Sequence, residues 1–469
     1  MPDLFFDLYV KEFEENIKPR LDGADRRSSS TYLLKVLDNV RPDEMWRELK
    51  GLSKRDDYYV AAVDGGIRTI SFTDGSEIVI ARAIAVNNFG DKPIRTVRAH
   101  YLPVPSSAAY WAYLGLAELE TCMKCVIEQL SKLPENREKY LLIDGSLYAR
   151  LIGAVHNLIL TRGFLDLYYV PEIMENLYKL CTLLEECASY GIQPIFVSKN
   201  SSLKILKDHI MFTLLKEAFK RDVGLKFSTE IYEIFTRGSE WYSIVWLRKY
   251  RKKLVELARE YNGSNRDLIR NGIKIVISQS ITDTCILEYL AHRCGLSCAI
   301  SRKLLIGIVD AYMNDKKLTS PDSIYRMIID RVEDSIMLRM CDDNEAEMYR
   351  RFAEKIRDKL NILPRILLAY VKFRKDDSPM LIEIPVNKWR LFDDTIPPKI
   401  FYDSFNMWNI LEVLFSEYKD PYHYNRMLWL AHNYVTFRDS EFNEYVMMTI
   451  KNLENVRGRR IHTLIMGVH

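Results

Sequence analysis

Residues 58–66 read Tyr-Tyr-Val-Ala-Ala-Val-Asp-Gly-Gly, an apolar run that leads directly into an aspartate and two glycines. A second apolar, β-rich run follows at 77–86. The Gly65-Gly66 and Asp74-Gly75 pairs between the two runs suit hairpin turns. We therefore predict an antiparallel meander that opens the domain, with Asp64 at a strand end.

Strands and helices alternate after this meander. Helical periodicity covers 107–132, and an apolar strand at 140–143 ends at Asp144-Gly145. Helical and strand patterns then continue at about 172–189, 193–197, 366–373, 380–385, 403–418 and 424–437. This order predicts an α/β fold with a mixed β-sheet core flanked by helices.

The 469 residues are enough for two or three folding units. We predict an N-terminal helical segment at 1–50 and the first part of the core at 51–202. A large helical insertion follows at 203–360, and a β-hairpin with helices at 361–469 completes the core. No internal repeat interrupts this organisation.

Composition sets limits on the class of protein. The 67 basic and 64 acidic side chains give a formal charge of +3, which neither demands nor excludes a nucleic-acid partner. The eight scattered cysteines indicate reduced thiols. The first 19 residues lack the pattern of a signal peptide, and no run is long and apolar enough to span a membrane. We therefore expect a soluble, cytoplasmic protein.

Two strand-Asp-Gly motifs, at Asp64 and Asp144, each place a carboxylate where a cation and a phosphate can meet. Taken singly, each aspartate is equally well explained as a cap of a turn. Phosphodiester hydrolysis with two cations needs a third acid, and the preceding helix offers Glu118 and Glu120. Glu118 shares its face with the small residues Cys122 and Cys125, so we favour it slightly.

Two further side chains are candidates for the same site. Lys199 follows a predicted strand in Val197-Ser198-Lys199 and could contact a phosphate, although a solvated lysine explains it as well. His432 lies on a predicted helix, where a histidine is more often a satisfied core residue than a catalytic group.

Other patterns carry weaker indications. Arg248, Lys249, Arg251 and Lys252, with aromatic residues between them, could follow a DNA backbone, or they could form a solvated helix face. The basic cluster at 457–460 could contact DNA or a partner protein, or it could be an ordinary charged surface. The cysteine pairs 122/125 and 294/298 are too far apart in sequence to favour a zinc site, and no phosphate-binding loop is present.

Several motifs in this order resemble the NurA nuclease family. They are Ala-Val-Asp64-Gly-Gly, a glutamate-bearing helix, Leu-Ile-Asp144-Gly-Ser-Leu, Val-Ser198-Lys199, Ile382-Glu-Ile-Pro385, and Asp420-Pro-Tyr leading to Leu430-Ala-His432. The chain departs from the family at the first motif, where Gly66 replaces the usual serine.

The resemblance implies an RNase H-like core and a DNA nuclease that uses manganese, with magnesium possible and two ions per site. Asp64, Asp144 and one of Glu118 or Glu120 would bind metal, His432 would join them, and Lys199 would contact phosphate. Ser146 and Ser198 are candidates for DNA contacts. The family further implies a homodimer and a HerA-type hexameric ATPase as partner in DNA end resection. The alternatives are a non-catalytic adaptor on the same fold and another RNase H-like ribonuclease.

Overall fold

The computed structural model describes residues 10–18, 33, 35–159, 164–199, 201–221, 229–240, 244–278, 280–307, 320–390, 399–453 and 461–462. Its contacts divide the chain into two compact units. The first, here called the helical unit, comprises Met1–Trp46 and Ser202–Gly295, and the second, the sheet unit, comprises Arg47–Ser201 and Leu296–His469.

The helical unit is built from short helices. They are η1 (Phe13–Ile17), η2 (Pro42–Glu44), α8 (Ile205–Arg221), α9 (Thr229–Glu240), α10 (Ile244–Glu260), α11 (Arg266–Ile277) and α12 (Asp283–Arg293). The buried Asp283 accepts the amides of Ile205 and Lys207 and so caps the start of α8. The ammonium of Lys207 donates to the last carbonyls of α11, which gives a fully buried charge its partners.

The sheet unit carries all of the long strands. Its elements are β1 (Trp46–Glu48), β2 (Tyr58–Phe72), β3 (Glu77–Asn87), β4 (Ile94–Leu102), α4 (Ser107–Glu128), η3 (Leu130–Lys132), β5 (Glu138–Asp144), α5 (Leu147–Ile159), α6 (Phe164–Leu167), α7 (Val170–Ser189), β6 (Ile192–Ser198), β7 (Ala299–Ser301), β8 (Leu304–Ile306), α14 (Pro321–Arg339), α15 (Asp343–Ile362), β9 (Pro364–Lys372), β10 (Met380–Arg390), β11 (Lys399–Phe401), α16 (Trp408–Ser416), α17 (Arg426–Val435), α18 (Asp439–Leu453) and β12 (Ile461–His462).

One mixed sheet runs through this unit in the order β1-β7-β9-β10-β6-β5-β2-β3-β4. Strands β2, β3 and β4 form the antiparallel meander, and β5 and β6 continue from β2 in parallel. Strand β10 then pairs with β6, and β9 with β10, both antiparallel. The sheet is thus mixed, with antiparallel and parallel neighbours, so the predicted α/β fold class with a mixed sheet is confirmed.

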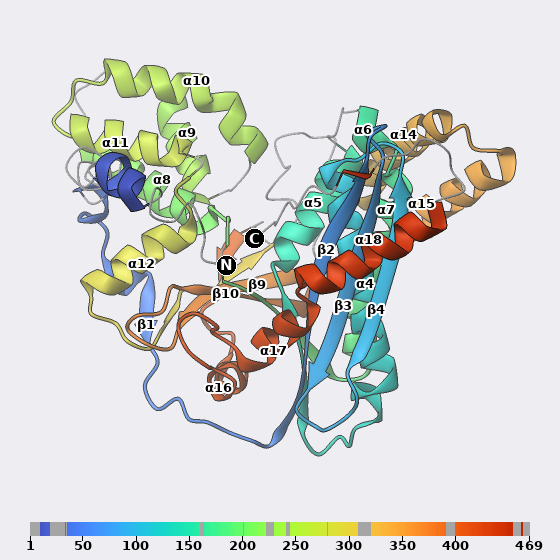
Figure 1. Ribbon diagram of the computed structural model, residues 1–469. Coiled ribbons are helices and arrows are strands. Elements are labelled where there is room, and N and C mark those ends of the chain that lie inside the picture. Colours follow the sequence, from blue (N-terminus) through green and yellow to red (C-terminus); the bar gives the residue numbers. More distant parts are fainter. Residues whose placement is uncertain are drawn as a thin grey trace. The chain divides into compact units, whose positions relative to one another are not determined.

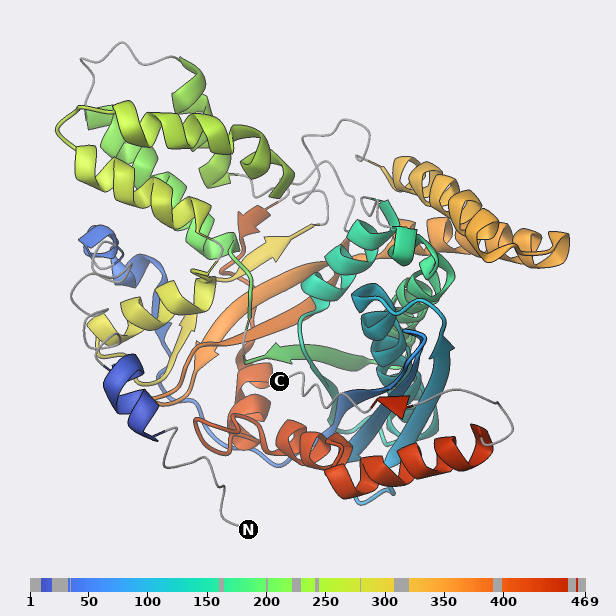
Figure 2. The ribbon, with the colours of Figure 1, turned by 45° about the horizontal axis from the view of Figure 1, so that its top comes forward.

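Helices cover both faces of the sheet (Figures 1 and 2). Helix α4 packs against the face of β3 that carries Val79, Ala81 and Ala83, and α7 packs on α4. Helices α16 and α17 cover the opposite face, and α18 packs on that face against Ile70 and Ile80. Figure 1 shows α18 crossing β2, β3 and β4 on the side opposite α4.

The contacts divide the chain differently from the expected segments 1–50, 51–202, 203–360 and 361–469. Residues 296–360 belong to the sheet unit, although we assigned them to a helical insertion. Two short strands, β7 and β8, occur there and pair with β9. The helices α14 and α15 pack against α5 and α7. Strands of three residues are too short to give a periodic signal, so the sequence pattern hid them.

The hairpin turn predicted at Gly65-Gly66 is wrong. Strand β2 continues through both glycines to Phe72, and the chain reverses only at the Asp74-Gly75 pair, where Gly75 has φ +82°. Asp64 therefore lies inside a long strand and not at its end.

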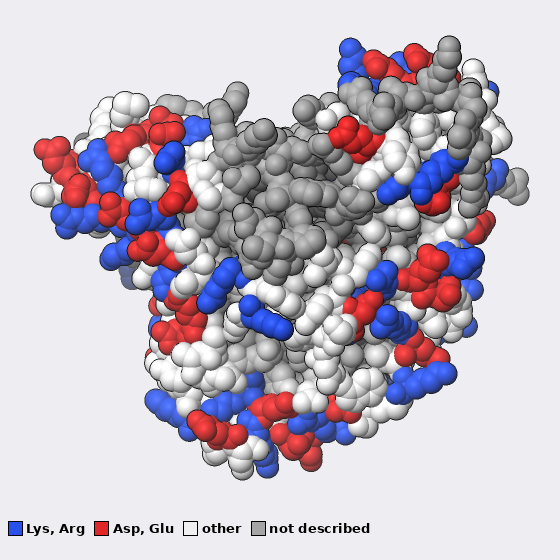
Figure 3. Space-filling model, turned by 180° about the vertical axis from the view of Figure 1, so that it is seen from behind, with Lys and Arg blue, Asp and Glu red and all other residues white. Residues whose placement is uncertain are grey.

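The remaining surface and composition features agree with a globular chain. Within the described residues no helix is both long enough and apolar enough to cross a membrane. All eight cysteines are free thiols, and Cys122 and Cys125 are buried in α4. Figure 3 shows Lys and Arg interspersed with Asp and Glu over one face, so the described residues of that face present no field of a single sign.

Candidate active site

Asp64 is held at the middle of β2, where the parallel pairing with β5 ends at Val63 opposite Ile143. It is 5% exposed. Its Oδ1 accepts a hydrogen bond from the amide of Gly65 at 2.7 Å, and its Oδ2 lies 2.9 Å from Nδ1 of His432. A residue of β2 thus meets a residue of α17, far along the chain.

The two glycines after Asp64 make room for neighbouring elements. A Cβ atom on Gly65 would lie 2.5 Å from Cγ and from Oε1 of Glu118. A Cβ atom on Gly66 would lie 2.9 Å from the carbonyl oxygen of Val435, at the end of α17. Close approach of α4 and α17 to β2 is therefore the reason that this strand has no side chains here.

Asp144 is the last residue of β5, as predicted, and it lies beside Asp64 on the neighbouring strand. Its Oδ1 accepts a hydrogen bond from the hydroxyl of Tyr424 at 2.9 Å. Gly145 follows with φ +94°, a conformation that favours glycine. Burial, and then the negative charge of Asp64, raise the pKa of Asp144 to about 6.

Glu118 reaches the same site from α4. It is 5% exposed, and its Oε2 accepts a hydrogen bond from Nη1 of Arg150 at 2.6 Å. Burial raises the pKa of Glu118, although the Arg150 guanidinium opposes this shift. The second amino group of Arg150, Nη2, donates to the backbone oxygen of Asp144 at 2.8 Å. Arg150 thereby joins two elements of the site.

Glu120 lies elsewhere on α4. Its Oε2 is 2.9 Å from Nε of Arg98, and its Oε1 is 2.9 Å from the ammonium of Lys124. The structure therefore brings Glu118, and not Glu120, to Asp64.

Helix α17 and the residue before its cap bring two side chains to the site, Tyr424 and His432. Asn425 caps this helix by accepting the amides of Met427 and Leu428, each at 3.0 Å. Tyr424, just before the cap, has φ +36°, which is uncommon for a residue other than glycine. His432 lies two turns further along; its side chain is 65% exposed, and its hydrogen bond with Asp64 raises the pKa of the imidazole.

Lys199 and Ser198 lie where β6 ends. The ammonium of Lys199 donates to the carbonyl oxygen of Tyr422, and it lies 5.9 Å from the ring centroid of Tyr424. Ser198 is the last residue of β6 and pairs with Leu381 of β10. Lys199, which follows β6, therefore binds the same loop that places Tyr424 against Asp144.

Ser146, for which we expect a DNA contact, makes two hydrogen bonds within the protein. Its hydroxyl accepts the amide of Ala149 at 3.0 Å and donates to Oε1 of Glu383 at 3.0 Å. Glu383, on β10, is fully buried, and burial raises its pKa to about 7.

Three residues of the site escaped the sequence analysis: Arg150, Glu383 and Tyr424. Glu383 lies within the motif at 382–385 and Tyr424 within the motif at 420–432, so the resemblance to the family was the signal that could have identified them. Arg150 had none, because a single arginine in an apolar helix has no distinguishing pattern.

The basic run on α10 is not brought into this site by any described contact. It belongs to the helical unit, where Arg251 and Lys252 are exposed and Lys252 lies 3.9 Å from Glu256. The side chains of Arg248 and Lys249, and all of residues 457–460, lie outside the described residues.

The carboxylates suit a hard divalent cation by their chemistry. Asp64, Glu118 and Asp144 supply oxygen donors, and the raised pKa values of the last two reflect acids that face one another with little solvent. Within the described ranges, no three His, Cys, Asp or Glu side chains are already arranged to hold a metal ion. Arg150, Tyr424 and His432 hold oxygens of the three carboxylates by hydrogen bonds.

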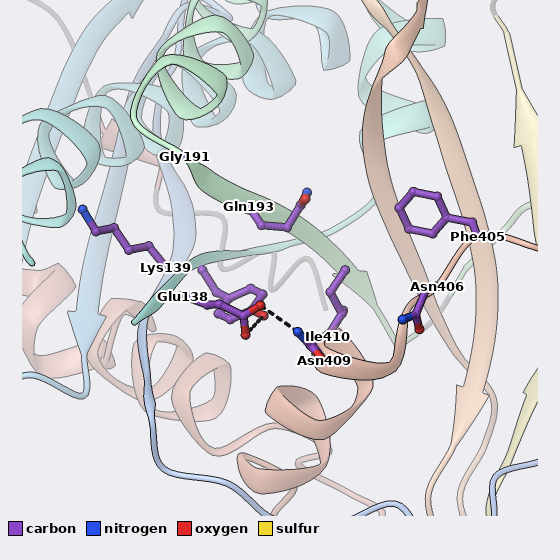
Figure 4. Close-up of a pocket in the computed structure, with 9 residues that line it drawn as sticks. Glu138, Lys139, Gly191, Gln193, Phe405, Asn406, Asn409 and Ile410 are labelled. Atoms are coloured by element: carbon purple, nitrogen blue, oxygen red, sulfur yellow. Dashed lines mark hydrogen bonds between the residues drawn. The ribbon is translucent and has the colours of Figure 1, made fainter. Parts of the chain in front are cut away.

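A separate cavity of about 280 Å³ opens at the other ends of β5 and β6. Figure 4 shows Glu138, Gln193 and Asn409 around it, with Glu138 bonded to Asn409 at 2.7 Å. Glu138 also pairs with Arg55, so its charge is already balanced. This cavity lacks the converging acids of the site at Asp64.

Comparison with curated proteins finds no significant match. Among solved structures, the NurA nuclease from Sulfolobus solfataricus is 13% identical with a TM-score of 0.45, covering 96% of this chain and 97% of that chain. A NurA structure with manganese is 16% identical with a TM-score of 0.40, covering 92% and 97%. A NurA structure bound to dAMP and manganese is 15% identical with a TM-score of 0.34, covering 96% and 98%. The family model of the NurA domain matches residues 59–437, which is most of the chain. The chain therefore belongs to the NurA domain family.

Proposed function

We propose that this protein is a metal-dependent DNA nuclease that hydrolyses phosphodiester bonds at the site around Asp64. One observation carries the proposal: Asp64, Glu118, Asp144 and His432 come from four elements far apart in the sequence and converge at one point of the sheet. Burying several acids together costs stability, which is a reason to expect that they serve chemistry.

Asp64, Asp144 and Glu118 would hold the ions, for which we propose manganese or magnesium and two per site. Such ions, when bound, supply Lewis acidity and make a water molecule a stronger nucleophile. The protein's own residues prepare the site for them. Burial leaves the oxygens of Asp64 and Glu118 with few competing water molecules, and Tyr424 fixes the rotation of the Asp144 carboxylate.

His432 is placed to move a proton. Its Nδ1 is bound to Asp64, so Nε2 of the exposed ring is the nitrogen that faces a substrate. The pKa of His432 is raised, so the ring holds its proton at neutral pH more readily than a free imidazole does. We assign to it the protonation of the leaving oxygen.

The loop before α17 supports a nucleic-acid substrate. The Lys199 ammonium lies beside this loop and supplies a positive charge for a phosphate. Tyr422, whose carbonyl oxygen accepts the ammonium of Lys199, is 80% exposed, although Asp420 fixes the surrounding turn by accepting the amides of Tyr422 and His423. An exposed aromatic ring next to a phosphate-binding lysine is suited to stacking on a base.

The biological setting is a proposal that follows from family membership. We infer 5'-3' exonuclease and single-strand endonuclease action, a homodimer, and a HerA-type hexameric ATPase as the partner in cytoplasmic DNA end resection. Ser198 remains a candidate for a DNA contact at the end of β6.

The decisive experiment measures degradation of labelled single- and double-stranded DNA with manganese, magnesium or a chelator, alone and with the ATPase. We expect metal-dependent cleavage by the wild type and a loss of at least about 100-fold in Asp64→Ala and Asp144→Ala, because each removes a metal ligand. Asp403→Ala is the matched control: this aspartate binds Arg302, between β7 and β8, beyond β10 and β9 in the sheet.

The outcomes separate the alternatives. Cleavage of RNA in preference to DNA would identify another RNase H-like ribonuclease. Absence of cleavage by the folded wild type, even with the ATPase, would support the non-catalytic adaptor. Equal loss of cleavage in Asp403→Ala would mean that the aspartate variants act through folding.

A further inference from the structure

Glu383 joins the C-terminal hairpin to the start of α5. Its Oε1 accepts the hydroxyl of Ser146 at 3.0 Å, and its Oε2 accepts the amide of Tyr148 at 3.2 Å. Ser146 at the same time accepts the amide of Ala149 as the cap of α5. Two amides of the first turn of α5 thus have side-chain acceptors: Ser146, just before the helix, and Glu383 of β10.

The helix that begins there carries Arg150. The amide of Arg150 donates to the carbonyl of Ser146 at 3.1 Å, in the first turn of α5. The guanidinium then binds Oε2 of Glu118 and the backbone oxygen of Asp144. Hydrogen bonds therefore lead without a break from Glu383 through Ser146 and Arg150 to two of the proposed metal ligands.

We propose that Glu383 is a positioning residue for the nuclease site, acting through Ser146 and Arg150 on Asp144 and Glu118. The inference rests on the proposed function. Only Gly145 separates Asp144 from Ser146, and Gly145 has φ +94°. A shift of Ser146 would therefore move Asp144 directly and would move Glu118 through Arg150.

The burial of Glu383 supports a functional role for the carboxyl group. Ser146 caps only one amide of α5, and the carboxylate of Glu383 on β10 accepts a second, the buried amide of Tyr148. Burial raises the pKa of Glu383 to about 7 in spite of its hydrogen bonds from Tyr148 and Ser146. The fold retains an acid here at a cost in stability.

The test compares wild type, Glu383→Gln, Ser146→Ala and the double variant. Measurements are kcat and KM on labelled single-stranded DNA, Mn²⁺ affinity by titration calorimetry, and melting temperature. For Glu383→Gln we expect kcat to fall about 10- to 100-fold and Mn²⁺ affinity to fall about 10-fold, with KM within about twofold, because the ligands are misplaced while substrate contacts remain. The losses in kcat should be less than multiplicative in the double variant, because both changes break one hydrogen bond.

Glu172→Gln is the matched control for a general loss of stability. Glu172 is also largely buried and binds Arg339 at 2.6 Å, between α7 and α14, outside the proposed site. We expect it to lower the melting temperature without lowering kcat. If Glu383→Gln leaves kcat and Mn²⁺ affinity unchanged in an active protein, the positioning role is overturned while the proposed function stands. The same conclusion follows if Glu172→Gln loses as much kcat as Glu383→Gln for an equal loss in melting temperature. A wild type that neither binds Mn²⁺ nor cleaves DNA would overturn both.

Discussion

Glu118 and Glu120 are two positions apart on α4, yet only Glu118 reaches Asp64. Two residues along a helix turn the side chain by about 200°, so the two acids must point in nearly opposite directions. Glu118 points to β2, over Gly65, and Glu120 points to Arg98 of β4.

This difference gives a sharp comparison of two isosteric changes. We expect Glu118→Gln to lower manganese-dependent cleavage by at least about 100-fold, since it removes a proposed ligand charge. Glu120→Gln should change cleavage by less than about threefold, since Glu120 pairs with Arg98 and Lys124 near the surface and away from Asp64. The measurement is kcat/KM on single-stranded DNA at saturating Mn²⁺. Equal effects of the two variants would contradict the assignment of Glu118.

Glu383 makes a specific contribution to the pH dependence of the protein's stability. Its pKa is raised in the folded protein, mainly by burial, to about 7 from a reference value of 4.5. The folded state therefore binds this proton more tightly than the unfolded state does, and stability falls as pH rises from about 4.5 to about 7. The full shift corresponds to a loss of at most about 3 kcal/mol.

Urea unfolding of the metal-free protein from pH 5 to pH 8 measures this effect. The stability advantage of the wild type over Glu383→Gln should shrink by about 2–3 kcal/mol across that range, because glutamine does not titrate there. Glu172→Gln provides the comparison for pH effects of other groups. A constant difference between wild type and Glu383→Gln would show that the carboxyl of Glu383 is not buried as described.

At the level of whole elements, the two glycines of β2 decide how closely helices approach the site. Helix α4 brings Glu118 to Gly65, and the end of α17 brings Val435 to Gly66. Glycines inside a strand lower its stability, because they lose more backbone entropy on folding and have no side chain to pack. The helices that pack closely against Gly65 and Gly66 compensate for this loss.

Gly65→Ala tests this packing directly. Its Cβ would meet Glu118 at 2.5 Å, so Glu118 must move. We expect a loss of about 1–3 kcal/mol in stability and of about 100-fold in cleavage. Gly153→Ala, on α5, is the control, because a Cβ there meets nothing within 4 Å. It should be neutral or stabilise by up to about 1 kcal/mol. Full activity of Gly65→Ala would argue against Glu118 as a ligand.

The loop before α17 yields a prediction about DNA affinity. In an inactive Asp64→Ala background, Tyr422→Ala should weaken binding of a labelled single-stranded oligonucleotide by about 1–3 kcal/mol, while Tyr422→Phe should bind like the parent, because stacking needs the ring and not the hydroxyl. Fluorescence anisotropy measures both. Tyr190→Ala, an exposed tyrosine just before the opposite end of β6, should have no effect. Weakening by Tyr422→Phe as well would point to the hydroxyl instead of stacking.

For the whole molecule, metal binding should stabilise the fold. Mn²⁺ at about 100 times its dissociation constant contributes about 2.7 kcal/mol, provided that it binds the native state alone. We expect the melting temperature to rise with Mn²⁺ in wild type and to return to its original value with chelator. The double variant Asp64→Ala, Asp144→Ala should not respond to Mn²⁺. A similar rise in that variant would place the metal elsewhere.

The sequence by itself determined the α/β class, the antiparallel meander, the strand that ends at Asp144 and the candidate set of acids. These features follow from local periodicity and from short motifs, which depend only on neighbouring residues. It did not determine that β2 runs through Gly65-Gly66, that β7 and β8 complete the sheet, or that residues 296–360 pack with the sheet unit.

The assembly of the site was decided only by the tertiary structure. Arg150, Glu383 and Tyr424 act on Glu118, Ser146 and Asp144 across separations in sequence of 32, 237 and 280 residues. No local pattern records such contacts, because they arise when α4, α5, β10 and α17 pack onto one sheet. The choice of Glu118 over Glu120 has the same origin: periodicity gives the angle between the two acids, and only packing shows which of them faces β2.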